Sequence, residues 1–415
     1  WSDMNGNGER LAIPALAATF AVQTIAAMAM FGVSVIAPVA AADIGVNATL
    51  IGAFTGLAYG SGLVVGLLSG RLADRFGALR TSQATMVFAL TGCLLLSIST
   101  PLAALASAIA LGLCYGPVNP LSTHILSRVV PERSQPLFFS IKQTGMPAGA
   151  ALAGLVLPFI VATYDWRVAI VSVGVAAAAT SVFIQPLRRR LDAIRAPGPP
   201  IRLSSFVEPI ILAWKIPMLR RLGLMGFTYS GVQVALMSFY VLYLIDDLSF
   251  SYASDVVSIN VNFYSISIPT VGFVYAILQI SAVAGRLFWG AIADRVAGAS
   301  PLLVGIGIAT AIFTTLAGTM DETWSILGVS VISLLLGVTS SGWNGLFFSE
   351  LVRFAPEGRT GDAAAALQFA TLSGVTIVPG AFGFVVTASG SYFVAFAAAG
   401  ALVLIGAIQF GLSLR

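Results

Sequence analysis

The stretch Gly70-Arg71-Leu72-Ala73-Asp74-Arg75 returns later in the chain as Gly290-Ala291-Ile292-Ala293-Asp294-Arg295. The two copies lie 220 positions apart, and four of their six residues are identical. Charged residues make up only 9% of the chain, so chance is a poor explanation for a match that includes an aspartate and an arginine. The repeat therefore indicates an internal duplication of the chain.

The composition is typical of a membrane protein. Hydrophobic residues make up 58% of the chain, and a soluble domain would carry roughly a quarter charged residues. Twelve apolar segments are each long enough to cross a hydrocarbon core about 30 Å thick, and they must do so as helices. They lie at about 12–42, 48–69, 81–99, 101–127, 137–162, 167–187, 222–245, 272–293, 300–319, 324–349, 360–388 and 391–413. We predict an all-α membrane protein with twelve transmembrane helices in two pseudo-symmetric six-helix bundles.

The same segments give the domain limits. The first bundle is predicted at 1–187, a cytoplasmic linker at 188–221 and the second bundle at 222–415. Residues 257–268 alternate between apolar and polar types, which is a strand pattern. It predicts a hairpin-like insertion near 249–271, outside the second bundle. Such an insertion could be a lid over the cavity or have no role, and the residues do not decide between the two.

Basic residues gather in alternate loops, which predicts the topology. The loops on one side hold nearly all of them: Arg71, Arg75, Arg80, Arg128, Arg133, those of the linker, Arg295, Arg353 and Arg359. The positive-inside rule assigns this side, and both termini, to the cytoplasm. We attribute the net charge of +4 to this topology. The expected partner is the lipid bilayer and not a nucleic acid.

The loop from Gly70 to Arg80 resembles the loop signature of the major facilitator superfamily. This resemblance implies the major facilitator fold, whose two bundles rock around a central cavity to give alternating access. In that family the loop helps to latch the bundles on the cytoplasmic side. The resemblance implies a set of gating residues: Arg71, Asp74, Arg75, Asp294 and Arg295. A turn solvated by its charges is the alternative reading.

Further stretches are similar to particular branches of this family. Phe139-Ser140-Ile141-Lys142-Gln143-Thr144-Gly145 and Gly342-Trp343-Asn344-Gly345 resemble bacterial cyanate-permease-like members. Ala284-Gly285-Arg286 is similar to the eighth helix of monocarboxylate porters, where an arginine at this place binds the substrate carboxylate. These resemblances imply a monomeric transporter of the bacterial inner membrane that uses no cofactor.

Arg286 is the most informative residue of the apolar segments. It precedes Asp294 by eight positions, about 12 Å along a helix. A guanidinium at that depth costs at least about 2.5 kcal/mol. Its equivalent under the repeat is Gly66, so a charge is not needed there in both halves. We predict that Arg286 faces a wet cavity and binds an anionic group. A bonded structural arginine, or one that snorkels to the interface, is the alternative.

Other polar residues of the apolar segments are candidates to line a substrate cavity. Tyr275 and Gln279 share a helix face with Arg286. Lys142 could attract an anion or snorkel to the interface. The remaining candidates are Tyr229, Gln233, Tyr115, Asn119, Trp343, Asn344 and Gln368. Each of these is equally well explained as a hydrogen bond between helices.

The titratable residues narrow the function. No carboxylate lies at the middle of a predicted helix, so coupling through a buried acid is not indicated. One histidine, His124, and two apolar cysteines do not form a metal site or an enzyme active site. We predict a secondary transporter of a small organic anion, monocarboxylate or cyanate-like, with proton coupling and exchange both open. The alternative is an efflux transporter for an apolar or cationic compound.

Overall fold

The computed structural model describes residues 2–131, 134–193, 211, 215–250, 256–261, 264–293, 299–356 and 360–414. Contacts within the chain define two compact units. Unit 1 comprises Trp1–Val46 and Leu57–Pro199, and unit 2 comprises Asn47–Gly56 and Pro200–Arg415. Twelve of the described helical segments are long and apolar enough to cross a membrane. The predicted all-α fold with twelve membrane helices is confirmed.

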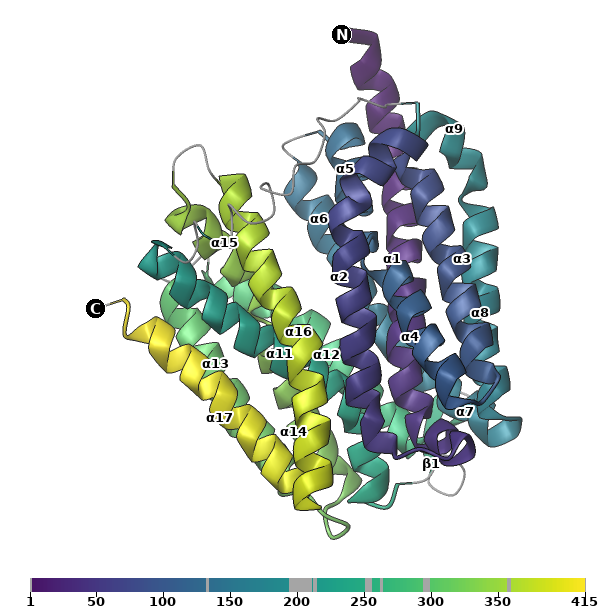
Figure 1. Ribbon diagram of the computed structural model, residues 1–415, viewed down its shortest axis with the longest axis vertical. Coiled ribbons are helices and arrows are strands. Elements are labelled where there is room, and N and C mark those ends of the chain that lie inside the picture. Colours follow the sequence, from purple (N-terminus) through teal and green to yellow (C-terminus); the bar gives the residue numbers. More distant parts are fainter. Residues whose placement is uncertain are drawn as a thin grey trace. The chain divides into compact units, whose positions relative to one another are not determined.

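Unit 1 is a bundle of helices that run side by side (Figure 1). Its elements are α1 (Ser2–Ile44), most of α2 (Ile51–Phe76), α3 (Ala78–Ser97), α4 (Pro101–Tyr115), α5 (Val118–Val129), α6 (Gln135–Gln143), α7 (Gly145–Thr163), α8 (Trp166–Phe183), the 3-10 turn η3 (Gln185–Leu187) and α9 (Arg188–Leu191). The tightest contacts pair α1 with α7 and α3 with both α4 and α8.

Unit 2 is a second bundle. It contains the 3-10 turn η1 (Ala48–Leu50), the start of α2, and α11 (Pro217–Asp246), α12 (Thr270–Ala293), α13 (Ala299–Ala317), α14 (Ile326–Ser340), α15 (Asn344–Phe354), α16 (Thr360–Ser389) and α17 (Tyr392–Gly411). The closest pairs are α11 with α16, α13 with α17 and α12 with α14.

A β-hairpin precedes α12, as the alternating pattern predicted. Strands β1 (Val256–Val261) and β2 (Tyr264–Pro269) are antiparallel. Val256 pairs with Pro269 and Val261 with Tyr264. Strand β2 ends at the residue before α12 begins, so the hairpin continues directly into a membrane helix.

Local sequence explains where the helices begin and turn. Thr100 caps α4, since its hydroxyl oxygen accepts a hydrogen bond from the Ala103 amide and Pro101 follows it. Ser325 caps α14 in the same way through the Gly328 amide. Gly390 turns the chain between α16 and α17 with a φ of 64°, which glycine adopts without steric cost.

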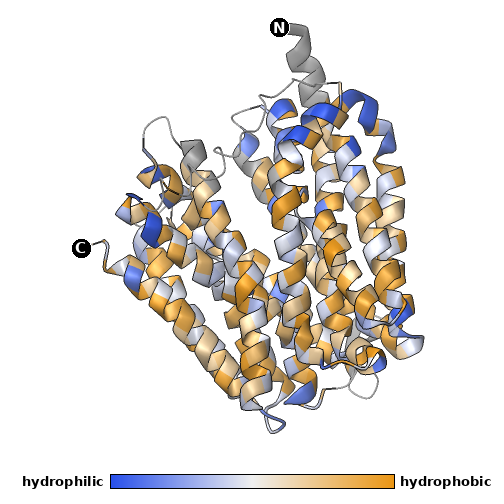
Figure 2. Cartoon of the chain, in the orientation of Figure 1, coloured by the Kyte–Doolittle hydropathy of each residue, from blue (hydrophilic) through white to orange (hydrophobic). Residues whose placement is uncertain are grey.

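The surface of the bundles suits lipid rather than water. Large apolar side chains such as Leu102, Leu327 and Phe384 are exposed. Figure 2 shows hydrophobic residues along the helices and hydrophilic residues gathered near their ends. Lipid chains would cover such side chains in a bilayer, so their exposure fits a membrane location.

Both units contain the same close helix crossing. A Cβ on Gly112 of α4 would lie 2.0 Å from the Oγ of Ser61 on α2. A Cβ on Gly337 of α14 would lie 1.9 Å from the Oγ of Ser281 on α12. Ser281 follows Ser61 by 220 positions, and Gly337 follows Gly112 by 225. The internal duplication that the loop repeat indicated is thus also seen in the way that α4 packs on α2 and α14 packs on α12.

We predict that Gly337→Leu destabilises the transmembrane fold, because the new side chain would displace Ser281 and the backbone of α12. Overpacking of this kind costs about 1–3 kcal/mol or more. Thermal unfolding of the purified protein in detergent measures the effect. Gly305→Leu on α13 is the matched control, because no atom lies within 4 Å of the place that a Cβ on Gly305 would take. Equal melting temperatures for the two variants would contradict the prediction.

Candidate functional site

The membrane span Ile326–Phe354 is interrupted between α14 and α15. Residues 341–343 form turns, so backbone groups there lose their usual helical partners. Inside a membrane such groups must be bonded by other parts of the protein. The carbonyl oxygen of Ser341 accepts hydrogen bonds from Arg286 Nε and from Asn344 Nδ2, each at 3.3 Å. Two predicted site residues therefore meet at this interruption.

Arg286 occupies a position that glycine fills in the other unit. Its equivalent at the 220-residue spacing is Gly66, and the equivalent of Ser341 at the 225-residue spacing that relates Gly112 to Gly337 is Gly116. A Cβ on Gly66 would lie 3.2 Å from the carbonyl oxygen of Gly116. Both units bring these helix positions together, yet only unit 2 places an arginine there. The related crossing in unit 1 forms without a charge, so Arg286 is not a general requirement of this crossing.

Buried side chains support the interruption from α11. Gln233 donates through Nε2 to the Ser341 hydroxyl at 3.0 Å and accepts from Trp343 Nε1 at 3.1 Å. The Trp343 ring stands edge-on to Tyr229 at 5.8 Å, a favourable arrangement for aromatic pairs. The Tyr229 hydroxyl donates to the Leu303 carbonyl at 2.9 Å. Gln233 and Trp343 thus fix the turn that Arg286 contacts, and the Tyr229 hydroxyl serves the contact between α11 and α13.

The other predicted residues of unit 2 differ in their surroundings. Tyr275 is buried and donates to the Met237 carbonyl at 3.2 Å. Gln279 is 1% exposed, and its Nε2 has no hydrogen-bond partner among the described residues. Gln368 on α16 is exposed. Gln279 interacts with the Tyr275 hydroxyl one turn earlier on the Arg286 face of α12, and its buried Nε2 lacks a well-formed hydrogen bond, so it is a donor that a ligand could use.

Unit 1 has its own buried basic residue. Lys142 lies near the end of α6 and is 1% exposed. Its Nζ donates to Asn119 Oδ1 on α5, which is the one bond of this amine among the described residues. An ammonium has three donors and Asn119 can take only one of them. Lys142 therefore points to a polar neighbour inside the bundle, and snorkelling into water explains it less well.

Polar groups of α1 lie beside Gly145, three residues after Lys142. A Cβ on Gly145 would lie 3.1 Å from Gln23 Cγ and 3.2 Å from Thr24 Oγ1. Gln23 Oε1 and Thr24 Oγ1 are both buried without a hydrogen-bond partner among the described residues. Unmet polar atoms of this kind are rare in native structures and call for a ligand or a water molecule. Tyr115 contributes aromatic contacts nearby, with its ring 5.6 Å from Tyr59 and 6.4 Å from Phe31.

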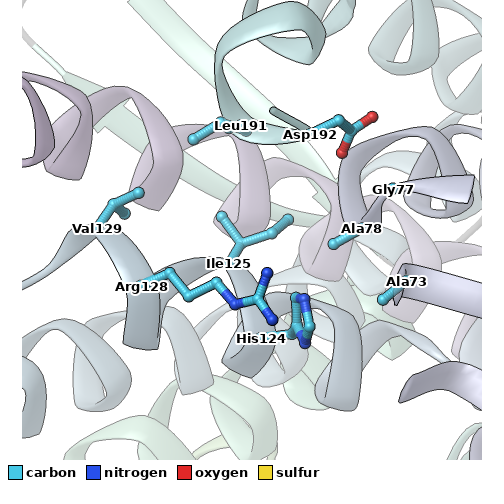
Figure 3. A pocket seen from close by; sticks show the side chains of 9 residues that line it. All are labelled: Ala73, Gly77, Ala78, His124, Ile125, Arg128, Val129, Leu191 and Asp192. Atoms are coloured by element: carbon cyan, nitrogen blue, oxygen red, sulfur yellow. The ribbon is translucent and has the colours of Figure 1, made fainter. Parts of the chain in front are cut away.

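The predicted gating aspartate contacts residues that the repeat did not identify. Asp74 Oδ1 lies 3.8 Å from Arg128 and 3.9 Å from His124. Arg128 and His124 lie side by side on α5 and line a small hollow with Gly77 and Asp192 (Figure 3). Asp74 of α2 therefore pairs with Arg128 of α5 and lies beside His124 of the same helix.

The other predicted gating residues have different positions. Arg71 and Arg75 are exposed, and the Arg75 guanidinium lies 5.3 Å from the centre of the Phe76 ring. Asp294 and Arg295 lie outside the described residues. The gating role of this set stays a prediction.

A second repeat in the sequence could have identified Arg128. Asn119, Arg128 and Pro131 recur 225 positions later as Asn344, Arg353 and Pro356. The shift differs from 220, so a search at one fixed spacing misses it. Its members include Asn119, which contacts Lys142, and Asn344, which contacts the Ser341 carbonyl.

Glu350 is a buried carboxylate that the sequence did not indicate, because it lies near the end of a predicted helix. It is 3% exposed on α15, accepts from the Ser300 hydroxyl and lies 3.4 Å from Arg353. Arg353 is the equivalent of Arg128. Each unit therefore pairs this repeated arginine with an acid, although the acid comes from a different helix in each case.

Comparisons with known proteins identify the family. The model of the Major Facilitator Superfamily matches residues 19–379. The chain belongs to the major facilitator superfamily. It is therefore a multi-pass transporter of the secondary type. A search of curated protein sequences gave no significant match.

Solved structures of other transporters share the fold of this major facilitator protein. A nucleoside transporter, NupG, is 13% identical with a TM-score of 0.75, covering 96% of this chain and 100% of its own. A POT family transporter in complex with 5-aminolevulinic acid is 14% identical with a TM-score of 0.73, covering 96% and 95%. An inward-facing bacterial homologue of the human lysosomal transporter Spinster is 14% identical with a TM-score of 0.71, covering 96% of this chain and 96% of its own. These matches span several branches, so the likeness to cyanate permeases and monocarboxylate porters stays a prediction.

We predict that Asp74→Asn and Arg128→Gln each slow transport by about threefold, which corresponds to a partly exposed ion pair of under about 1 kcal/mol. The double variant should be no slower than the slower single variant, because both changes remove one interaction. Initial uptake rates in proteoliposomes measure this. Arg75→Gln is the comparison, since Arg75 stacks on Phe76. The slowing caused by Arg75→Gln should add to that caused by Asp74→Asn. If the slowing caused by Arg128→Gln also adds to that of Asp74→Asn, the ion pair between Asp74 and Arg128 is contradicted.

Proposed function

We propose that this transporter moves a small organic anion, a monocarboxylate or cyanate-like ion, and that Arg286 is its counter-charge. One observation supports the proposal most strongly. Two related helix crossings occur in the two units, and the crossing in unit 2 has Arg286 where the crossing in unit 1 has Gly66. A guanidinium in a membrane helix is costly to desolvate. A substrate that needs its charge supplies a reason for retaining it.

The surroundings of Arg286 suit an anion with oxygen acceptors. Arg286 Nε is held by the Ser341 carbonyl, which orients the guanidinium. Guanidinium groups bind carboxylates through two parallel hydrogen bonds. Gln279, two turns earlier on α12, has a buried Nε2 that lacks a well-formed hydrogen bond among the described residues. A carboxylate or cyanate-like anion offers acceptors to both groups.

The test of Arg286 is uptake of labelled monocarboxylates and cyanate into proteoliposomes. Arg286→Gln should lower uptake by about tenfold or more, the effect of losing a charged hydrogen bond. Arg286→Lys keeps the charge but loses the planar fork, so it should restore uptake only in part. Arg220→Gln on α11 is the matched control and should transport normally.

Two outcomes would overturn this assignment. Equal uptake by the wild type and a folded Arg286→Gln protein would make Arg286 a structural residue. Absence of anion uptake, with transport of cationic or apolar compounds instead, would favour the efflux function. Size-exclusion chromatography of each variant separates a loss of transport from a loss of folding.

Lys142 is proposed, from its surroundings in unit 1 alone, as a residue that attracts the anion. It is buried, has one neutral partner among the described residues, and precedes by three residues Gly145, which packs against Gln23 and Thr24. We predict that Lys142→Met abolishes anion uptake while the protein still purifies as a folded species. Asn119→Ala, which removes only the amide partner, should raise the half-saturating anion concentration and retain the maximal rate. Full transport by Lys142→Met would remove this residue from the proposal.

The same vesicles distinguish the modes of coupling. A proton symporter accumulates the anion when a pH gradient is imposed across an otherwise unloaded vesicle. An exchanger accumulates it only when the vesicle is first loaded with a counter-anion. Either result is compatible with Arg286 as the counter-charge, so the two questions are answered separately.

A further inference from the structure

Three consecutive arginines follow the last membrane helix of unit 1. Helix α8 ends at Phe183, η3 follows it, and α9 consists of Arg188, Arg189, Arg190 and Leu191. Arg189 and Arg190 are exposed and Arg188 is partly exposed. The positive charges are thus concentrated within one turn at the end of a membrane span.

This turn is anchored to the bundle. Ile184 and Leu191, on either side of the arginines, are buried. Asp192 accepts hydrogen bonds from the backbone amides of Leu79 at 2.8 Å and Arg80 at 3.2 Å, at the start of α3. The arginines are therefore held at a fixed place relative to α3 and α8.

Gly77 makes the anchor possible. Its φ is 99°, and a Cβ there would lie 2.3 Å from Asp192 Cγ. Any other residue would both strain the backbone and push the carboxylate away from the α3 amides. A second anchor joins the same elements, because Gln83 Nε2 donates to the Ser181 carbonyl at 2.8 Å and to Gln185 Oε1 at 2.7 Å.

Apolar side chains adjoin the arginines. Val182 is 74% exposed and Phe183 is 83% exposed on the last turn of α8. A surface hollow of about 390 Å³ is lined by Arg188, Arg189, Asp192 and Ala193. In Figure 2 the ribbon at α9 is coloured hydrophilic and follows the mostly hydrophobic ribbon of α8. The place combines strong positive charge with side chains that suit lipid chains.

In the described part of the chain, Asp192 is the one acidic side chain that lines the hollow, and its carboxylate is bound by the amides of α3, so positive charge is in excess there. The backbone amide of Arg80 donates to Asp192, so Arg80 lies beside the turn that contains the three arginines of α9. The ion pairs found among the described residues of unit 1 involve Arg128 and Arg167, and none includes Arg80 or the arginines of α9. We name Arg80, Arg188, Arg189 and Arg190 the interfacial arginine cluster.

We propose that the interfacial arginine cluster binds the headgroup phosphate of an anionic phospholipid, with the acyl chains along Val182 and Phe183. Guanidinium groups pair with phosphate oxygens in a planar, two-bond geometry. Basic clusters next to a membrane span attract anionic lipids. The exposed apolar side chains distinguish a lipid from a soluble phosphate, because only a lipid has chains to cover them.

The test is lipid binding by the purified transporter, titrated with phosphatidylglycerol or phosphatidylcholine and read by native mass spectrometry. The triple variant Arg188→Gln, Arg189→Gln, Arg190→Gln should bind phosphatidylglycerol about tenfold more weakly. The control triple variant Lys215→Gln, Arg220→Gln, Arg221→Gln loses the same charge on α11 and just before it, and it should bind as the wild type does. Raised salt should weaken binding to the wild type.

Three results would overturn the proposal. Undiminished phosphatidylglycerol binding by the α9 variant would show that its arginines are not the site. An equal loss in both triple variants would show that only net charge matters. Displacement of the lipid by glycerol phosphate as readily as by phosphatidylglycerol would show a site for soluble anions. A melting temperature close to that of the wild type confirms that each variant is folded.

Discussion

The carbonyl oxygen of Ser341 is the group on which the candidate site of unit 2 depends. A membrane interior contains no water to bond a carbonyl that its helix has released. Arg286 and Asn344 therefore both donate to this oxygen, and Gln233 holds the adjacent hydroxyl and Trp343. One interrupted helix thus fixes a cation, an amide and an aromatic ring in one small region.

Much of this transporter could be predicted from its sequence. The apolar segments gave the twelve helices, since length and hydrophobicity alone determine which segments can span a bilayer. The loop repeat indicated the duplication that Gly112 and Gly337 show in their contacts. The alternation before α12 predicted β1 and β2. These features depend on local pattern, which a single sequence contains.

The partners of the candidate residues could not be predicted in the same way. Asp74 meets Arg128 and His124 because two helices come together, and spacing along the chain does not encode that meeting. The break at residues 341–343 gave Arg286 its backbone partner, and no proline marks that break in the sequence. Lys142 illustrates the same limit, since its burial beside Asn119 decided against snorkelling only once the helices were placed.

The hairpin runs directly into α12, so a displacement of the hairpin along the helix axis would also displace Arg286. Strand β2 ends at Pro269, and Arg286 lies sixteen residues after Thr270 on one continuous helix, about 24 Å away. A helix transmits displacement along its axis with little loss. A nanobody that binds the strands would therefore hold the first turn of the same helix that carries Arg286.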